Sequence, residues 1–306
     1  MNRYIKYIFA LIIILILAYI FCVVKHQFTM IDYMLINNLQ CGKPMCDIDV
    51  NKNLPVLMPP SDLKLSSDTI SFHKSLINFM ASIIYYSLHD QNYISLMGMS
   101  SLKQIDTSTD KLIAVVSKIE GIDNVLLIGI RGTQNLSDLL EDTHFAQVPF
   151  TTTFTTKGNT GHPMCHQGFL NVHNQIKNQV INQIHNETQI ILSGHSLGAA
   201  VACLLGMTIK MIFPSIQVGV VAYACPRLGN KDLCDTLNNN IQIIRIRNDS
   251  DAVPNFPSAV SPNEDDPTQP WLYFHAENQQ VLFNDNWKSV MNNHLIPVYL
   301  NFINNL

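Results

Sequence analysis

The sequence feature that most restricts the fold is an apolar strand followed at once by a tight corner and a long apolar helix. The segment "TQIILS" (188–193) is typical of a buried strand, and "AAVACLLGMTIKMI" (199–212) is typical of a buried helix. Between them, Ser196 is flanked two residues away on either side by Gly194 and Gly198. The glycines let neighbouring backbone pass close to the corner without side-chain clashes.

Strands and helices alternate along most of the chain. Runs rich in β-branched residues predict further strands, at 111–119, 124–132, 218–224 and 241–246. Apolar residues at helical spacing predict helices, at 72–87, 168–184 and 295–306. This pattern indicates an α/β fold, a mostly parallel central sheet with helices on both faces. We assign residues 61–306 to this domain and residues 27–60, which lack periodicity, to a stalk.

The N-terminal segment predicts a membrane anchor. Residues 7–24 are uncharged and long enough to cross a bilayer as a helix. The run ends in bulky residues and lacks a small-x-small cleavage site, so we favour an uncleaved signal anchor over a cleaved signal peptide. Arg3 and Lys6 precede the run, which predicts a cytosolic tail and anchor over residues 1–26. The rest of this single-pass membrane protein is then expected on the lumenal or extracellular side.

Composition excludes some functions and leaves others open. The net charge of −4 and the lack of a basic run argue against nucleic acid as a partner. Seven cysteines cannot all pair within the chain. Cys41 and Cys46 either close a small disulfide loop or remain free thiols. Sequons at Asn135, Asn186 and Asn248 are about as many as chance gives in so asparagine-rich a chain.

The corner at Ser196 predicts a nucleophile. The pattern G-x-S-x-G between a strand and a helix is typical of a nucleophile elbow, which exposes the serine hydroxyl above the sheet. The structural alternative is a simple strand-to-helix turn with serine as the N-cap. A serine nucleophile needs a histidine base oriented by a carboxylate, in the chain order Ser, acid, His.

Residues downstream of Ser196 supply candidates for both partners. Asp249 and Asp251 follow the strand at 241–246 and both qualify as the acid. The remaining downstream histidines are His275 and His294. We favour His294, because it lies between a polar loop and the closing apolar segment, whereas the residues around His275 are typical of a strand.

Several separate stretches resemble the class 3 lipases, the fungal triacylglycerol lipase-like branch of the α/β-hydrolases. They occur in the family's order over about residues 75–300, as "IGIRGT" (128–133), "HQGFL" (166–170), "GHSLGAA" (194–200), "ACPRLGN" (224–230), "NDSDAVPNFP" (248–257) and "NNHLIPVY" (292–299). The fifth stretch is similar to D-x-V-P-x-x-P and singles out Asp251 as the acid. The last is similar to D-H-x-x-Y and supports His294 as the base.

The chain departs from the family pattern at a few positions. Ala224 and Cys225 are mild departures within the fourth stretch. Asn293 replaces the aspartate before the histidine, and one extra residue precedes Tyr299.

The resemblance implies ester hydrolysis by a Ser196–His294–Asp251 triad. The implied oxyanion hole consists of Leu197, through its backbone N–H, and Thr133. A short amphipathic lid is implied within residues 134–150, where a plain surface helix is the alternative. His195 is expected to pack beside the elbow. No cofactor is expected, and the group of His162, Cys165 and His166 is not expected to bind a metal, because no second ligand pair accompanies it.

These observations together favour a membrane-anchored serine lipase or esterase that acts on acylglycerols or phospholipids. Its expected partners are a lipid ester and a membrane or droplet surface, and no obligate protein partner is implied. Two alternatives remain: a catalytically silent lipid-binding or structural membrane protein on a lipase fold, and a non-lipid esterase or acyltransferase.

Overall fold

A computed structural model describes most of the predicted domain. The described residues are 79–81, 83–84, 99–107, 114–119, 122–132, 145–151, 162–284 and 290–305. No helix among them combines the length and the apolarity needed to cross a bilayer. The predicted anchor (7–24), the stalk (27–60), the cysteine pair Cys41 and Cys46 and Thr133 all lie outside the described residues.

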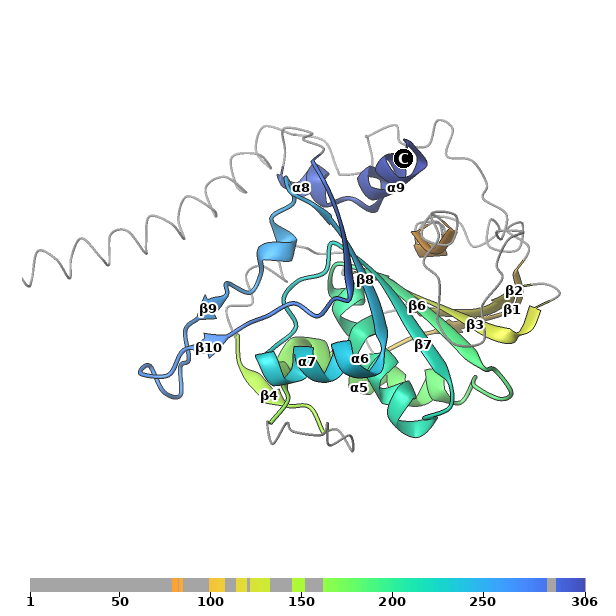
Figure 1. The fold of residues 1–306 in the computed structure, drawn as a ribbon, viewed down its shortest axis with the longest axis horizontal. Helices are drawn as coiled ribbons and strands as arrows, with labels where there is room; N and C mark the ends of the chain where they lie inside the picture. The colour runs from red at the N-terminus through yellow and green to blue at the C-terminus, as the bar shows by residue number, and fades with distance from the viewer. Residues whose placement is uncertain are drawn as a thin grey trace, which may run out of the picture.

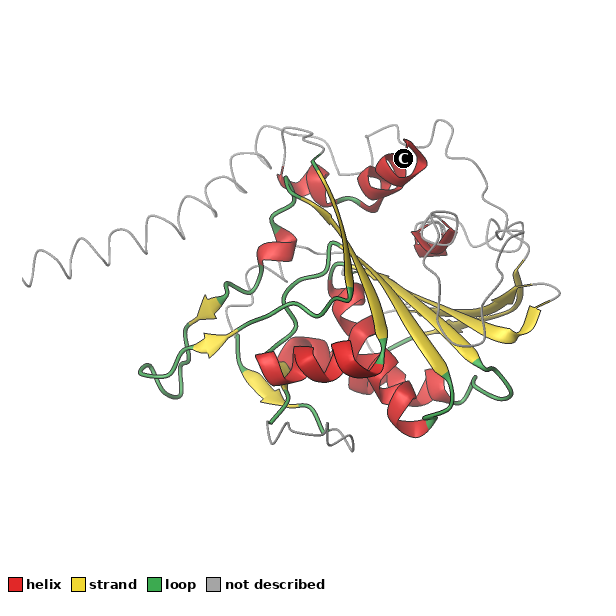
Figure 2. Ribbon diagram, in the orientation of Figure 1, coloured by secondary structure: helices red, strands yellow, loops and turns green. Residues whose placement is uncertain are grey.

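The centre of the described structure is a twisted seven-stranded sheet of order β1-β2-β3-β6-β7-β8-β11 (Figure 2). Its strands are β1 (Met99–Ile105), β2 (Ala114–Ile119), β3 (Ile122–Ile130), β6 (Gln189–His195), β7 (Gln217–Tyr223), β8 (Gln242–Asn248) and β11 (Gln279–Phe283). From β3 to β11 all neighbours run parallel, while β1, β2 and β3 are antiparallel. The sheet is therefore mostly parallel, as predicted.

Helices cover both faces of this sheet (Figure 1). One face carries α5 (Gln167–Ile181), α6 (Leu197–Ile212) and α7 (Lys231–Asn240), and the other carries helical residues 79–84 and α9 (Ile296–Asn305). Shorter elements complete the domain: β4 (Gln147–Pro149), β5 (Met164–His166), η2 (Val253–Asn255), β9 (Val260–Ser261), β10 (Trp271–Leu272) and α8 (Val290–His294). β4 pairs with β5, and β9 pairs with β10.

Burial on both sides explains why the central strands are apolar almost throughout. In β8, Ile243 packs in the core beneath α6, whereas Ile244 and Ile246 pack in the core beneath α9. Successive strand residues point to opposite faces, so a strand covered on both sides needs apolar residues at every position. The helix α6 is buried along most of its length for the same reason. The carboxyl ends of β6, β7 and β8 then meet at one edge of the sheet.

The structure confirms most of the elements that the sequence predicted but differs at several places, of which three concern the main sheet, its helices or the site candidates. α7 was not predicted, because few apolar residues mark its inner face; Asn230 starts it by accepting a hydrogen bond of 3.0 Å from the Leu233 N–H. β1 was not predicted either. The strand expected around His275 is wrong, since His275 lies in the connection between β10 and β11.

Candidate active site

The corner between β6 and α6 has the geometry that the glycine spacing predicts. Ser196 adopts φ 59° and ψ −129°, a left-handed conformation that strains a residue with a side chain. Its backbone N–H donates a hydrogen bond of 3.0 Å to the carbonyl oxygen of Tyr223, at the end of β7. A Cβ atom at Gly194 would overlap the backbone of Gly198 one turn later. The corner therefore closes only when both positions lack side chains.

The elbow also packs tightly against the end of β3. A Cβ at Gly198 would overlap the carbonyl oxygens of Ile130 and Arg131. A Cβ at Gly132 would lie 2.8 Å from the carbonyl oxygen of His195 and 3.2 Å from the Cβ of Ser196. The chain thus leaves β3 directly beside Ser196. Thr133, the second expected oxyanion donor, is the next residue and lies outside the described part of the chain.

The Ser196 hydroxyl is buried at the start of α6. Ser196 is 2% exposed, and its Oγ forms no hydrogen bond with any described residue. The structure therefore shows no Ser196–His294 hydrogen bond. The backbone N–H of Leu197 opens α6, where unsatisfied N–H groups and the helix dipole favour negative charge.

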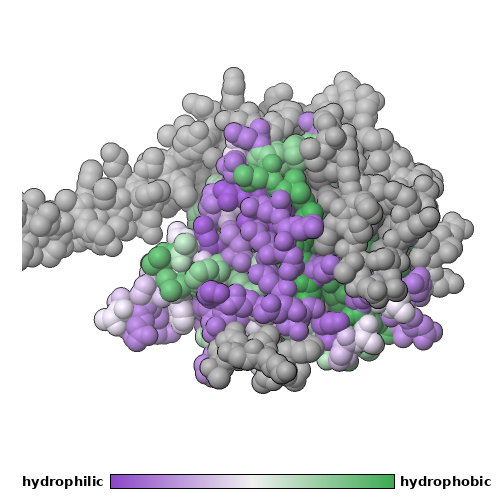
Figure 3. All heavy atoms as spheres, in the orientation of Figure 1, coloured by the Kyte–Doolittle hydropathy of each residue, from purple (hydrophilic) through white to green (hydrophobic). Residues whose placement is uncertain are grey.

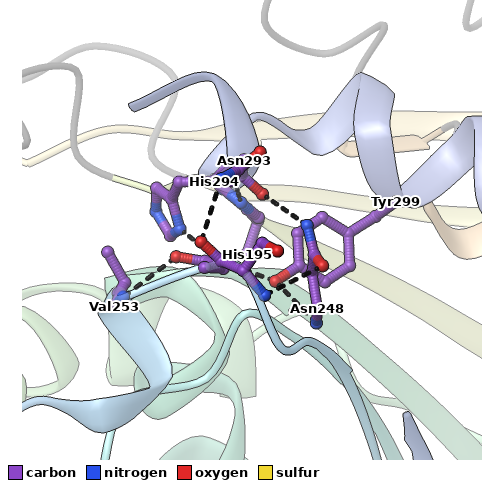
Figure 4. Close-up of polar contacts among 8 residues, drawn as sticks. His195, Asn248, Val253, Asn293, His294 and Tyr299 are labelled. Atoms are coloured by element: carbon purple, nitrogen blue, oxygen red, sulfur yellow. Dashed lines mark hydrogen bonds and ion pairs between the residues drawn. The ribbon is translucent and has the colours of Figure 1, made fainter. Parts of the chain in front are cut away.

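Asp251 lies in the loop after β8 and is fully buried. Its carboxylate accepts hydrogen bonds from the Nδ1 atom of His294 at 2.8 Å, the Tyr299 hydroxyl at 2.6 Å and the Val253 N–H at 2.9 Å (Figure 4). These donors compensate for the cost of burying a charge. Asp249, the other candidate acid, instead pairs with Arg247 at 3.4 Å, and 45% of its side chain is exposed. The structure thus brings Asp251, and not Asp249, together with His294.

His294 is the last residue of α8 and lies beside the residue that precedes the serine. Its ring centroid is 4.5 Å from that of His195. A carboxylate can only accept, so the hydrogen bond to Asp251 places a proton on Nδ1 of His294 and leaves Nε2 with the lone pair of a base. The other candidate base, His275, lies apart from this network. Burial and then the charges of three arginines lower its pKa to about 3.

His195 holds the segment that carries His294. Its Nε2 donates a hydrogen bond of 2.6 Å to the backbone carbonyl of His294. Burial, and then the proximity of His294, keeps the pKa of His195 well below its usual value. The ring is therefore a neutral donor, and His195 packs beside the elbow as expected.

The sequence did not assign roles to three further residues that join the acid loop to the C-terminal helices. Tyr299 donates to Asp251, and burial followed by the Asp251 charge raises its pKa well above its usual value, so it stays a donor. Asn293 Nδ2 donates to the carbonyl oxygen of Ser250 at 3.0 Å. Asn248 Nδ2 donates to the carbonyl oxygen of Asn293 at 3.3 Å. The sequence clue to the role of Tyr299 was its place in the D-H-x-x-Y match.

Asn248 also begins one of the three glycosylation sequons. It is fully buried, which excludes glycosylation of that sequon in the folded domain.

The histidine–cysteine group before α5 has structural contacts. Nδ1 of His166 accepts a hydrogen bond of 3.0 Å from the Gly168 N–H, which caps α5, and its ring stacks on Phe169 with centroids 4.3 Å apart. Burial raises the pKa of Cys165 to about 12, so this thiol is not a thiolate ligand at neutral pH. Within the described ranges, no three His, Cys, Asp or Glu residues are grouped to hold a metal ion.

Comparison with known proteins finds a family model that matches the part of the chain that carries Ser196 and Asp251, and several similar relatives. Residues 127–261 match the family model described as Lipase (class 3). Phospholipase A1-II 1 from Oryza sativa subsp. indica is 29% identical over 155 residues, which are 43% of this chain and 39% of the rice protein. Phospholipase A(1) DAD1, chloroplastic, from Arabidopsis thaliana is 28% identical over 159 residues, 46% of this chain and 35% of that protein. The match thus spans well under half of each plant relative.

A solved structure supports the fold. The mono- and diacylglycerol lipase from Aspergillus oryzae superposes with a TM-score of 0.52 at 19% identity, over 73% of this chain and 85% of that chain. The described domain therefore has an α/β-hydrolase-like lipase fold with a mostly parallel central sheet. The family match contains Ser196 and Asp251 but ends before His294, so the place of His294 in the site rests on its contacts with Asp251 and His195.

Proposed function

Because residues 127–261 match the family model described as Lipase (class 3), we propose that this chain hydrolyses carboxylic esters of acylglycerols or phospholipids. The observation that carries the proposal is the buried hydrogen bond between Asp251 and His294, which lies next to the strained corner at Ser196. A buried carboxylate that fixes an imidazole tautomer beside a serine is the arrangement that activates a serine nucleophile.

The proposed reaction proceeds through an acyl-enzyme. Ser196 Oγ attacks the ester carbonyl while Nε2 of His294 accepts its proton, and His294 then delivers that proton to the leaving alcohol. Water then attacks the acyl-enzyme while His294 accepts its proton. His294 returns that proton to Ser196 Oγ as the fatty acid leaves. Asp251 holds His294 in the required tautomer and stabilises the imidazolium that forms.

The oxyanion formed on each attack needs donors in place before the reaction. The backbone N–H of Leu197 is one proposed donor, and Thr133, the residue after Gly132, is the other. The close approach of Gly132 to the elbow supports this assignment, because a Cβ at Gly132 would lie 3.2 Å from the Cβ of Ser196. Loss of one oxyanion donor typically costs about 3–4 kcal/mol of the activation barrier.

The first test is covalent labelling of the full chain in detergent with a fluorophosphonate probe, followed by peptide mass mapping. We expect the adduct on Ser196 and none in Ser196→Ala. Ser215→Ala, which changes an exposed serine in the turn after α6, is the matched control and should label fully. A folded protein that stays unlabelled with lipid present would overturn the proposal and favour a silent lipid-binding role.

The second test identifies the substrate class. Unlabelled chain would be assayed against mixed micelles of a phospholipid and, separately, of a triacylglycerol, with release of fatty acid as the readout. The phospholipases A1 among the relatives support the first substrate, and the resemblance of the sequence motifs to the fungal triacylglycerol lipase-like family supports the second. Transfer of the acyl group to an added alcohol in preference to water would instead identify an acyltransferase.

We also propose that residues 7–24 anchor the chain in a membrane, with the hydrolase domain on the lumenal or extracellular side. The apolar length of the run and the basic residues before it support this topology. Retention of the full chain in the membrane pellet at alkaline pH, and its release on deletion of residues 7–24, are the expected results. Protease digestion of sealed vesicles should leave the domain intact.

A further inference from the structure

The hairpin of β9 and β10 exposes an unusual amount of apolar surface. Within the described residues, the large exposed apolar side chains include Val260 at 61%, Leu272 at 48% and Phe274 at 39%, all on or next to this hairpin. Val260 and Leu272 are cross-strand partners, so their side chains lie on the same face. Figure 3 shows a green, hydrophobic patch on the left of the molecule, where Figure 1 places β9 and β10, beside a purple and white protruding loop.

The opposite face of the hairpin is fixed to the body of the domain. Tyr273, between the exposed Leu272 and Phe274, is buried, and its hydroxyl donates to the carbonyl oxygen of Phe145 at 2.8 Å. Gln147 Nε2 donates to the carbonyl oxygen of Leu272 at 2.9 Å. The Phe274 N–H donates to the carbonyl oxygen of Gly229 at 2.8 Å. The apolar face is therefore presented on a well-anchored element.

The loop that joins the two strands is also organised by its own hydrogen bonds. Asn263 Oδ1 accepts from the N–H groups of Asp265 and Asp266, at 3.1 and 3.2 Å. Asp266 Oδ1 accepts from the Thr268 N–H at 3.0 Å. A hairpin that is already ordered loses little conformational entropy when its apolar face is covered.

The charges around the apolar face indicate what kind of surface covers it. No lysine or arginine occurs between Arg247 and Lys288, whereas Glu264 and Asp265 are exposed in the hairpin loop. Anionic lipid surfaces attract basic segments and repel acidic ones. The hairpin therefore suits a zwitterionic or uncharged lipid surface, bound through apolar contact.

The position of the hairpin links it to the candidate active site. It lies in the same connection, between β8 and β11, as Asp251. Its hydrogen bonds to Phe145 and Gln147 attach it to the segment directly after residues 134–144, the larger part of the expected lid. A lipid surface held at the hairpin would thus meet the same connection that carries Asp251.

We propose that the β9–β10 hairpin is a lipid-contact surface that docks the domain on zwitterionic or neutral lipid, through Val260, Leu272 and Phe274. This inference rests on the proposed function, because it assigns the surface on which the ester substrate is met. Trp271 is half-buried, directly precedes Leu272 on β10, and provides a spectroscopic reporter one residue away from this face.

The test uses the full chain with Trp287→Phe, which leaves Trp271 as the only tryptophan. The protein would be mixed with phosphatidylcholine vesicles that carry brominated acyl chains, and flotation would confirm that it is bound. We expect Trp271 emission to move to shorter wavelength and to be quenched about twofold or more by the bromines. Unchanged emission in protein that floats with the vesicles would overturn the proposal, whatever other segment holds the chain to the lipid.

Two variants in this background test the assigned residues. Val260→Ser/Leu272→Ser removes apolar area from the hairpin, and Ile212→Ser/Leu282→Ser removes a similar area from exposed positions elsewhere. We expect the hairpin variant to lose the bromine quenching and to hydrolyse vesicle substrate about tenfold more slowly, with hydrolysis of a soluble short-chain ester unchanged. The control should match the parent chain. Equal loss in both variants would contradict the proposal.

Two further outcomes are informative. If partial replacement of phosphatidylcholine by phosphatidylglycerol strengthens quenching at low salt, the assignment to neutral lipid is wrong. If the emission shift appears without vesicles and grows with protein concentration, the face binds a second copy of the chain, and the lipid assignment is overturned. Because fluorophosphonate labelling of Ser196 needs no hairpin contact, failure of the hairpin proposal and failure of the proposed function are separately observed.

Discussion

The side-chain amide of Asn293 donates a hydrogen bond of 3.0 Å to the backbone carbonyl of Ser250, the residue before Asp251. This bond joins the helix that carries His294 to the loop that carries the proposed acid. An aspartate, which the family pattern places at this position, has no proton to donate when ionised. Asn248 adds a second link in the opposite direction, to the carbonyl oxygen of Asn293.

Asn293→Ala removes the first of these links. We expect kcat for a soluble ester to fall about tenfold with KM nearly unchanged, because His294 and Asp251 lose part of their alignment. The free energy of unfolding should fall by about 1 kcal/mol. Asn292→Ala, a half-buried asparagine on the same helix, is the matched control and should keep the parent kcat. A variant with lowered stability but full kcat would show that the link is only structural.

Tyr299→Phe removes the hydroxyl that donates to Asp251 at 2.6 Å and keeps the ring. The ring packs edge-on against Phe283 with centroids 5.2 Å apart, so the phenylalanine should fill the same space. Hydrogen bonds to charged groups contribute about 1.5–3 kcal/mol, and we expect the unfolding free energy to fall by that amount. Denaturant unfolding at pH 8 measures it. A loss below about 0.5 kcal/mol would argue against a charged acceptor at Asp251.

Gly198→Ala and Gly206→Ala form a matched pair on α6. At Gly198 the new methyl group would overlap two backbone carbonyls of β3, which cannot move without disturbing the sheet. We expect a loss of about 3 kcal/mol or more, or no folded protein. At Gly206 a Cβ would meet only side-chain ends, at 3.2–3.3 Å, and alanine favours the helix, so the change should stay within about 1 kcal/mol. Thermal unfolding of both variants checks the difference, and equal effects would contradict the packing described for the elbow.

His173 makes the stability of the domain depend on pH. Burial lowers its pKa from 6.5 to about 4, and its Nε2 lies 2.9 Å from the Thr208 hydroxyl, which joins α5 to α6. At pH values between the folded pKa of about 4 and the usual pKa of 6.5, His173 binds a proton in the unfolded chain but not in the folded chain. The stability that the neutral ring provides is therefore complete above about pH 6.5 and is lost as the pH falls toward 4.

His173→Gln removes this titration and keeps a donor for Thr208. Between pH 7 and pH 5 we expect the parent chain to lose about 2 kcal/mol more than the variant, from a single displaced pKa of this size. Urea unfolding at the two pH values measures the difference. Parallel losses in the two proteins would mean that the native ring already accepts a proton near pH 6.

The sequence alone determined the order of the central elements and the identity of the nucleophile candidate. Consecutive apolar residues in β6 (190–192) and β8 (243–244) indicate burial on both faces, and the glycine spacing around Ser196 requires a corner, because these are properties of neighbouring residues. α7 and β1 were missed because they contain few apolar residues, and the contacts that stabilise them come from distant parts of the chain.

Only the tertiary structure shows which candidate acid contacts which candidate base. Spacing allowed Asp249 or Asp251 and favoured His294 over His275, and the resemblance to the family singled out Asp251 and supported His294. Folding buries Asp251 with three donors, turns Asp249 toward Arg247 and leaves His275 apart from the network. Hydrogen bonds between residues more than forty positions apart, such as those from His294 and Tyr299 to Asp251, depend on how the strand ends meet, and local sequence does not encode that distance.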